Sequence, residues 1–101
     1  MKFDIEITKT LHGYNADGSK VAISEGDEVY IKFDLPNMKL YDKEDWLRRY
    51  PDGWIKCRVH NISNAGQRIM FAVLDRFGFY LTPTQKHILA VSDKAPKEVS
   101  Q

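Results

Sequence analysis

Cysteine and histidine together can provide a nucleophile and its general base. Cys57 and His60 lie three positions apart in the stretch 54–62, which alternates between apolar and polar residues as a β-strand does. Side chains an odd number of positions apart on a strand point to opposite faces, so this pair cannot exchange a proton. We therefore predict no catalytic centre and expect Cys57 to be a small core residue.

Metal and cofactor chemistry has no pattern in the sequence either. His12, His60 and His87 are not spaced from one another, or from Cys57, as metal ligands are, and a structural metal site usually needs four ligands. No glycine-rich loop of the kind that holds phosphate groups occurs. The sequence thus predicts a protein that is not an enzyme and has no metal and no cofactor.

The stretch 54–62 nevertheless places a distinctive set of side chains on one face of its strand. One register holds Ile55, Cys57 and Val59. The other register holds an indole, two cationic groups and an imidazole, those of Trp54, Lys56, Arg58 and His60. Two interpretations remain open: an ordinary solvated face beside a covered indole, or a contact strip for a partner, because Trp and Arg are enriched at the energetic centres of interfaces.

Five further residues are candidates for partner contact. They lie in the segment 35–53 and in the bend near residue 78, and they are Tyr41, Trp46, Arg49, Phe77 and Phe79. Trp46 has an alternative role, because it shares a helical face with Tyr50 and the two rings can seat the segment on the rest of the fold.

Charge and length limit the class of protein. The 101 residues carry 15 Lys and Arg against 14 Asp and Glu, so no strong field of one sign draws the chain to nucleic acid or to an acidic membrane. A single cysteine excludes an internal disulfide. The sequence has no leader pattern and no long apolar run, which predicts a cytoplasmic protein without a membrane span.

Nucleic-acid binding remains an alternative because bases and aromatic residues are interleaved. The bases that could contact phosphate are Arg48, Arg49, Lys56, Arg58, Arg68 and Arg76. Carboxylates lie close to them in the sequence, which favours weak or partner-assisted binding.

Alternation and turn residues divide the chain into short elements. Residues 2–24 predict an N-terminal hairpin whose first strand turns Phe3, Ile5 and Ile7 to one side. The segment 35–53 breaks the alternation and predicts a helical insertion with Asp42 as its N-cap. The run TPTQKHI predicts one helical turn capped by Thr82, and residues 94–101 predict a flexible tail.

Nine apolar residues should be buried together if the strands after residue 28 form one curved sheet. They are Val29, Ile31, Phe33, Ile55, Cys57, Val59, Ile69, Phe71 and Val73. Short strands joined by tight turns can hide their edges by closing on themselves. We therefore expect one all-β domain over residues 1–93, a small and strongly bent barrel of five to six strands with the hairpin and the helical insertion.

Three segments in order carry a resemblance to a known family: GDEVYIKF at 26–33, DGWIKCRV at 52–59 and MFAVLDRFGFYLTPTQKHIL at 70–89. They resemble the Tudor-like branch of the Src-homology-3-like barrels. In that branch a Gly-Asp turn opens the first strand, a Gly-aromatic step opens the second, and an Asp and a Gly close the third before a short helical turn. The resemblance covers about residues 26–91 and implies the fold.

Tudor-like domains that bind methylated Arg or Lys do so with a cage of aromatic rings. The resemblance puts the cage positions at Phe33, Ile55, Leu74 and Phe77, and it puts Phe79 where the family commonly has Asn. Because only two of the four positions are aromatic, the resemblance implies the fold and not this ligand.

We expect from these observations a non-enzymatic binding module. It would be an accessory or regulatory protein, of the kind that includes phage-type inhibitors, which binds a larger protein complex. The alternative is a nucleic-acid-binding barrel, because KOW-type barrels share similar spacing and contact nucleic acid and ribosomes. Protein is the expected partner and nucleic acid the alternative.

Overall fold

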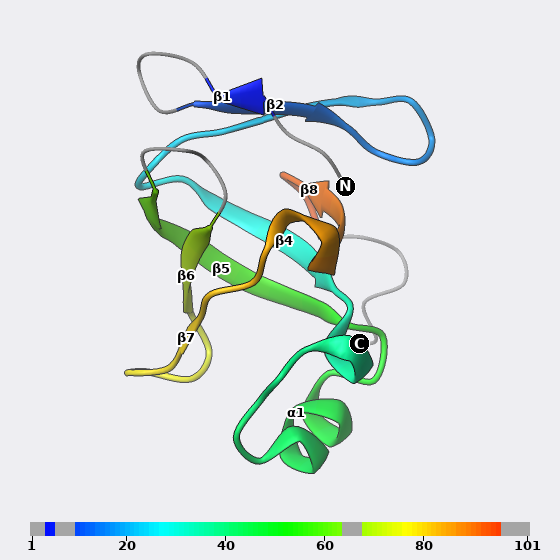
Figure 1. Cartoon of the computed structure of the whole chain (residues 1–101), viewed down its shortest axis with the longest axis vertical. Helices are drawn as coiled ribbons and strands as arrows, with labels where there is room; N and C mark the ends of the chain where they lie inside the picture. Colours follow the sequence, from blue (N-terminus) through cyan, green and yellow to red (C-terminus); the bar gives the residue numbers. More distant parts are fainter. Residues whose placement is uncertain (1–3, 6–9, 64–67, 96–101) are drawn as a thin grey trace.

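Two antiparallel sheets make up the fold, which a computed structural model describes for residues 4–5, 10–63 and 68–95, with residues 4 and 5 described by their backbone alone (Figure 1). The large sheet has the order β7-β6-β5-β4-β8. Its strands are β4 (Glu28–Phe33), β5 (Trp54–Ile62), β6 (Ile69–Val73), β7 (Tyr80–Leu81) and β8 (Ile88–Ser92). The small sheet has the order β1-β2-β3, with β1 (Asp4–Ile5), β2 (Leu11–Tyr14) and β3 (Lys20–Ile23).

The helical residues lie in two connections of the large sheet. The 3-10 turn η1 (Leu35–Asn37) and helix α1 (Lys43–Arg49) form the predicted insertion between β4 and β5, at the end of the molecule away from β1, β2 and β3 (Figure 1). The 3-10 turn η2 (Gln85–His87) precedes β8. The mainly β class, the hairpin and the short helical insertion predicted from the sequence are therefore confirmed.

The core lies on the inner face of the large sheet. All nine residues predicted to be buried together belong to one hydrophobic cluster, and none is more than 6% exposed. Phe33 and Phe71 meet edge to face, with ring centroids 5.5 Å apart. The period-two pattern in the sequence thus identified the inner face correctly, because in β4, β5 and β6 successive side chains alternate between core and solvent.

The N-terminal hairpin is formed by β2 and β3, and β1 is an additional strand on β2. Leu11 and Ile23 are paired partners and are completely buried. Asn15, in the turn between β2 and β3, reaches the last strand of the large sheet. Its side chain donates to the Val91 carbonyl at 2.8 Å and accepts from the Val91 N–H at 2.9 Å. The hairpin is therefore fastened to the open edge of β8.

In the described residues the large sheet is not the closed barrel that the sequence predicts. The two end strands, β7 and β8, are not paired with each other. Two features accompany the open edge. Strand β7 is only two residues long, and the edge of β8 is covered at Val91 by Asn15.

Both predicted helix caps differ in detail. Asp42 does occupy the N-cap position of α1, but it is left-handed (φ 57°) and its side chain makes no cap hydrogen bond. Its carbonyl instead accepts from the N–H groups of Asp45 and Trp46. The N-cap of η2 is Thr84, not Thr82. The predicted alternation of Phe3, Ile5 and Ile7 and most of the predicted tail lie outside the described residues.

Candidate binding groove

The strip predicted on β5 is an outer face of the large sheet. Lys56, Arg58 and His60 are exposed and Trp54 is half-buried, whereas the residues between them face the core. Arg58 forms an ion pair with Glu28 on the neighbouring strand, and this hydrogen bond and charge lower the pKa of the Glu28 carboxyl. The Lys56 ammonium lies 5.8 Å from the centre of the Tyr30 ring. Arg58 and Lys56 therefore already have partners on β4.

Cys57 is a core residue, as the sequence predicts. The thiol is buried, contacts the Ile55 carbonyl at 3.6 Å and faces away from His60, which is exposed on the other side of β5. Burial raises the pKa of the Cys57 thiol, and the negative charge of Asp75 raises it further. Within the described residues no three His, Cys, Asp or Glu side chains gather as metal ligands do.

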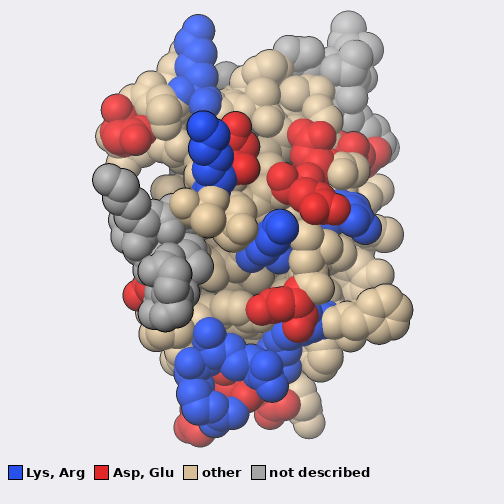
Figure 2. Space-filling model, turned by 180° about the vertical axis from the view of Figure 1, so that it is seen from behind, with Lys and Arg blue, Asp and Glu red and all other residues tan. Residues whose placement is uncertain are grey.

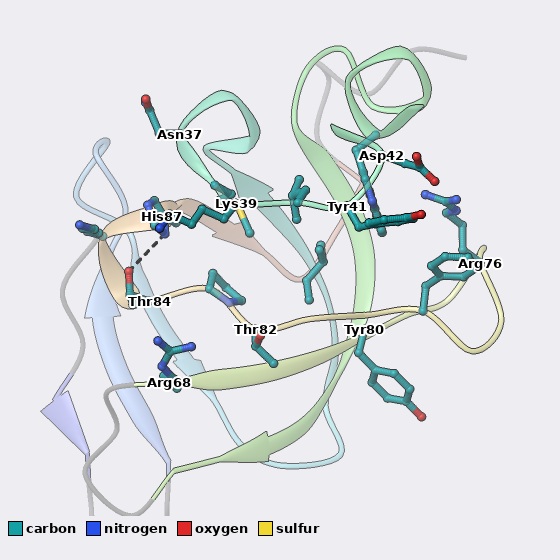
Figure 3. A pocket seen from close by; sticks show the side chains of 17 residues that line it. Asn37, Lys39, Tyr41, Asp42, Arg68, Arg76, Tyr80, Thr82, Thr84 and His87 are labelled. Carbon is teal, nitrogen blue, oxygen red and sulfur yellow. Dashed lines mark hydrogen bonds between the residues drawn. The ribbon is translucent and has the colours of Figure 1, made fainter. Parts of the chain in front are cut away.

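A groove of about 660 Å³ lies on another part of the surface, and Figure 3 shows it from close by. Residues 37–42, which join η1 to α1, form one wall, and residues 79–87, from β7 to η2, form the other. We call this cleft between the two segments the groove. Its volume is in the range of ligand-binding clefts.

The base of the groove is apolar and its rim carries rings. Met38, Leu81 and Pro83 are buried among the lining residues. Tyr41 is 91% exposed and Phe79 is 47% exposed. Tyr80 contributes its backbone to the wall, while its ring points away from the groove (Figure 3) and lies 5.2 Å from the ring of His60. The strip on β5 and the groove therefore meet at Tyr80.

The charge around the groove is mainly positive. Three lining cations, Lys39, Arg68 and Lys86, make no ion pair with any described residue. Asp42 is the one carboxylate in the lining, all of which belongs to the described part of the chain. On the face seen in Figure 2, acidic and basic side chains are intermingled. The groove thus differs in charge from that face.

Arg76 closes one end of the groove. Its guanidinium carbon lies 4.4 Å from the centre of the Trp46 ring and 4.3 Å from that of Phe79, and Nη2 lies 3.0 Å from an Asp45 oxygen. Nη1 is buried without a hydrogen-bond partner among the described residues. A flat, weakly hydrated guanidinium suits a site between two rings better than an ammonium does.

A second contact fixes the insertion close to Arg76. The Tyr50 hydroxyl donates to Asp75 at 2.6 Å, and the Tyr50 ring stacks on Trp46 with centroids 5.7 Å apart. Burial, and then the hydrogen bond to Asp75, raise the pKa of the Tyr50 phenol. Trp46 and Tyr50 therefore seat the insertion on the sheet, which is the alternative role considered for them from the sequence.

The predicted contact residues fall into separate places. Tyr41 and Phe79 line the groove, and Phe77 is fully exposed outside it. Trp46 is only 4% exposed, so it supports the groove from inside instead of presenting a surface. Arg49 is exposed on α1 and pairs with Asp45 at 3.1 Å. Of the positions implied for an aromatic cage, Phe33 and Ile55 are core residues, so the fold brings no cage together there.

Sequence reasoning missed Lys39, Thr82 and Lys86 as groove residues, and it named Arg68 only as a possible phosphate contact. The two walls are about forty residues apart in the chain, and no local pattern says that they face each other. One signal was present: the segment 37–42 follows Pro36, lies outside the alternating runs and yet contains three large apolar residues, Met38, Leu40 and Tyr41. Such a segment usually lies on the surface and often carries function.

Comparison of the chain with family models, with curated proteins and with solved structures finds no match. Among the described residues, no helix is both long and apolar enough to cross a membrane. The chemistry of the groove therefore has to be interpreted from its own residues.

Proposed function

We propose that this chain is a non-enzymatic binding module that holds an extended segment of a partner protein in the groove. The observation that carries the proposal is the combination found there: a buried apolar base, exposed rings at the rim and three cations without ion-pair partners in the described part of the chain. Binding sites are usually concave, with placed polar groups that orient the ligand, and the exposed lining of this groove is at least as polar as it is apolar. Accessory or regulatory action on a larger complex is the role that fits such a module.

We also propose that the domain is a variant of the Src-homology-3-like fold. Support comes from the strand order over the segment of resemblance, where β4, β5, β6 and β7 are sequential neighbours and β8 returns beside β4 after the turn η2. The variant is open between β7 and β8. Folds of this kind carry many functions, so the proposal about binding depends on the groove alone.

Affinity capture with three forms of the protein tests the binding proposal. The groove variant combines Tyr41→Ala with Lys39→Glu, and the control is Tyr14→Ala, which removes a tyrosine that is 62% exposed on the hairpin and does not line the groove. We expect wild type and Tyr14→Ala to retain the same protein from a lysate after nuclease treatment, and the groove variant to lose it. Equal retention by all three forms would remove the proposal.

A nucleic-acid strand is the second candidate, because Lys39, Arg68 and Lys86 could contact phosphates and Tyr41 could stack on a base. Binding of single-stranded oligonucleotides should then weaken with salt, with a log-log slope of about 0.7 per phosphate neutralised. Retention that depends on nuclease-sensitive material, together with such a slope, would favour this candidate over a protein partner.

A further inference from the structure

One edge of the large sheet, at β8, is covered by a side chain, whereas the other edge, at β7, is open in the described residues. At β8 the side chain of Asn15 bonds both backbone groups of Val91 at the edge, as a neighbouring strand would. At the other end of the sheet, β7 forms one wall of the groove and has no strand beside it on the groove side in the described residues. An open sheet edge is a template for pairing with another chain. Here that edge faces a cleft and not open solvent.

The register identifies which backbone groups of this edge are available. The Val73 N–H donates to the Phe79 carbonyl at 3.0 Å, and Phe71 is paired with Leu81. In an antiparallel ladder the residues between such bonded pairs point their N–H and C=O groups the other way. Tyr80 and Thr82 therefore turn their backbone groups to the groove, and no backbone hydrogen bond joins Thr82 to another described residue.

Charge selects the kind of strand that fits. Arg68 lies on the β7 side of the groove and Lys39 on the opposite wall (Figure 3). Lys86 belongs to the 79–87 wall, and none of the three cations has an ion-pair partner among the described residues. Side chains of an added strand alternate between two sides, so carboxylates on it would meet these cations while apolar side chains met Leu81 and Pro83.

We propose that the groove binds an acidic, extended segment of a partner protein by adding it as a strand to the open edge of β7, with hydrogen bonds to the backbone of Tyr80 and Thr82. The inference rests on the proposed function and specifies its mode of binding. Main-chain hydrogen bonds provide affinity in this mode, and the pockets for alternate side chains provide specificity.

The probe is a display library of random dodecapeptides, selected on the wild-type protein. We expect the selected peptides to be rich in Asp and Glu. Thr82→Pro deletes the outward N–H and should lower the affinity for these peptides about tenfold or more. The matched control Thr82→Val keeps the N–H and should change the affinity less than about twofold. Thermal melts of both variants check that the fold is retained.

A second measurement leaves the protein unchanged. Two sets of peptides are compared, one methylated on the odd-numbered backbone nitrogens and one on the even-numbered. One set should lose binding and the other should keep it, because only one edge of an added strand faces β7. Equal binding of both sets, or full affinity for folded Thr82→Pro, overturns strand addition. If such peptides still require Lys39 and Tyr41, the proposed function stands. If they ignore these residues as well, both proposals fail.

Discussion

At the scale of single residues, Arg76 joins two parts of the chain that the sequence separates. Its guanidinium lies between the rings of Trp46, on α1, and Phe79, after the β6–β7 turn, and it pairs with Asp45. The insertion forms one wall of the groove and the residues from Phe79 onward form the other. The width of the groove therefore depends on this side chain.

Replacing Arg76 should destabilise the protein more than replacing Arg48, which pairs with the same carboxylate of Asp45. Arg76→Ala removes two ring contacts and a largely buried ion pair, and we expect the free energy of unfolding to fall by about 2–3 kcal/mol. Arg48→Ala removes an exposed partner of the same carboxylate and should cost less than about 0.5 kcal/mol. Urea unfolding measures both values. Equal losses would mean that the ring contacts contribute nothing.

Cys57 should be chemically silent in the folded protein. The thiol is completely buried and its pKa is raised, and only the thiolate reacts with a disulfide reagent. At pH 8 we expect labelling by Ellman's reagent to be about a thousandfold slower than in guanidinium, because it requires opening of the core. Rapid and complete labelling in native buffer would contradict the core assignment.

At the scale of elements, the junction between the insertion and β5 depends on a glycine. Gly53 has φ +79°, and a β-carbon there would lie 2.6 Å from the Phe33 carbonyl oxygen. The Phe33 N–H also donates to the Gly53 carbonyl at 2.9 Å. The close approach of the two backbones is what returns the chain from the insertion to the edge of β4, where β5 begins.

Gly18→Ala provides a matched control for this junction. Gly18 has φ +88° in the hairpin turn, but a β-carbon there would meet nothing within 4 Å. We expect Gly18→Ala to cost about 1–2 kcal/mol for the left-handed conformation alone. Gly53→Ala should cost at least about 1 kcal/mol more, because backbone atoms must move apart. Equal midpoints in urea for the two variants would show that the contact with Phe33 is unimportant.

At the scale of the whole molecule, one core connects the sheet to the insertion and the hairpin. Phe71 lies in β6, between β7 and β5, is completely buried and meets Phe33 edge to face. Phe71→Ala should lower the free energy of unfolding by about 3–5 kcal/mol, a large share of the stability of a small domain. Phe77→Ala, at a fully exposed ring, should leave the melting temperature almost unchanged. Similar losses for both would contradict the assigned core.

The sequence predicted the parts of the fold that depend on local periodicity. In β5 the alternation placed Ile55, Cys57 and Val59 inside and the strip outside, as observed. It did not predict that Asn15 covers the edge of β8, a contact between residues 76 positions apart, nor that the sheet stays open beside Pro83. Both depend on how distant segments meet, and no short pattern encodes that.

The candidate site was predicted only in part, for the same reason. Tyr41 and Phe79 were identified by their residue type. Lys39 and Thr82 can be recognised as groove residues only when the two walls are known to face each other. Trp46 was identified as an aromatic residue of the insertion. Because it is buried, it supports the groove from within and presents no surface to a partner.

Chemical-shift mapping of ¹⁵N-labelled protein shows whether the groove is the binding surface. The ligand is a peptide selected from the display library on the wild-type protein. We predict that the largest amide shifts fall in residues 39–42 and 79–87, with smaller changes at His60, which contacts Tyr80. Shifts concentrated on Trp54, Lys56 and Arg58, or on the hairpin, with the groove amides unmoved, would show that the groove is not the binding surface.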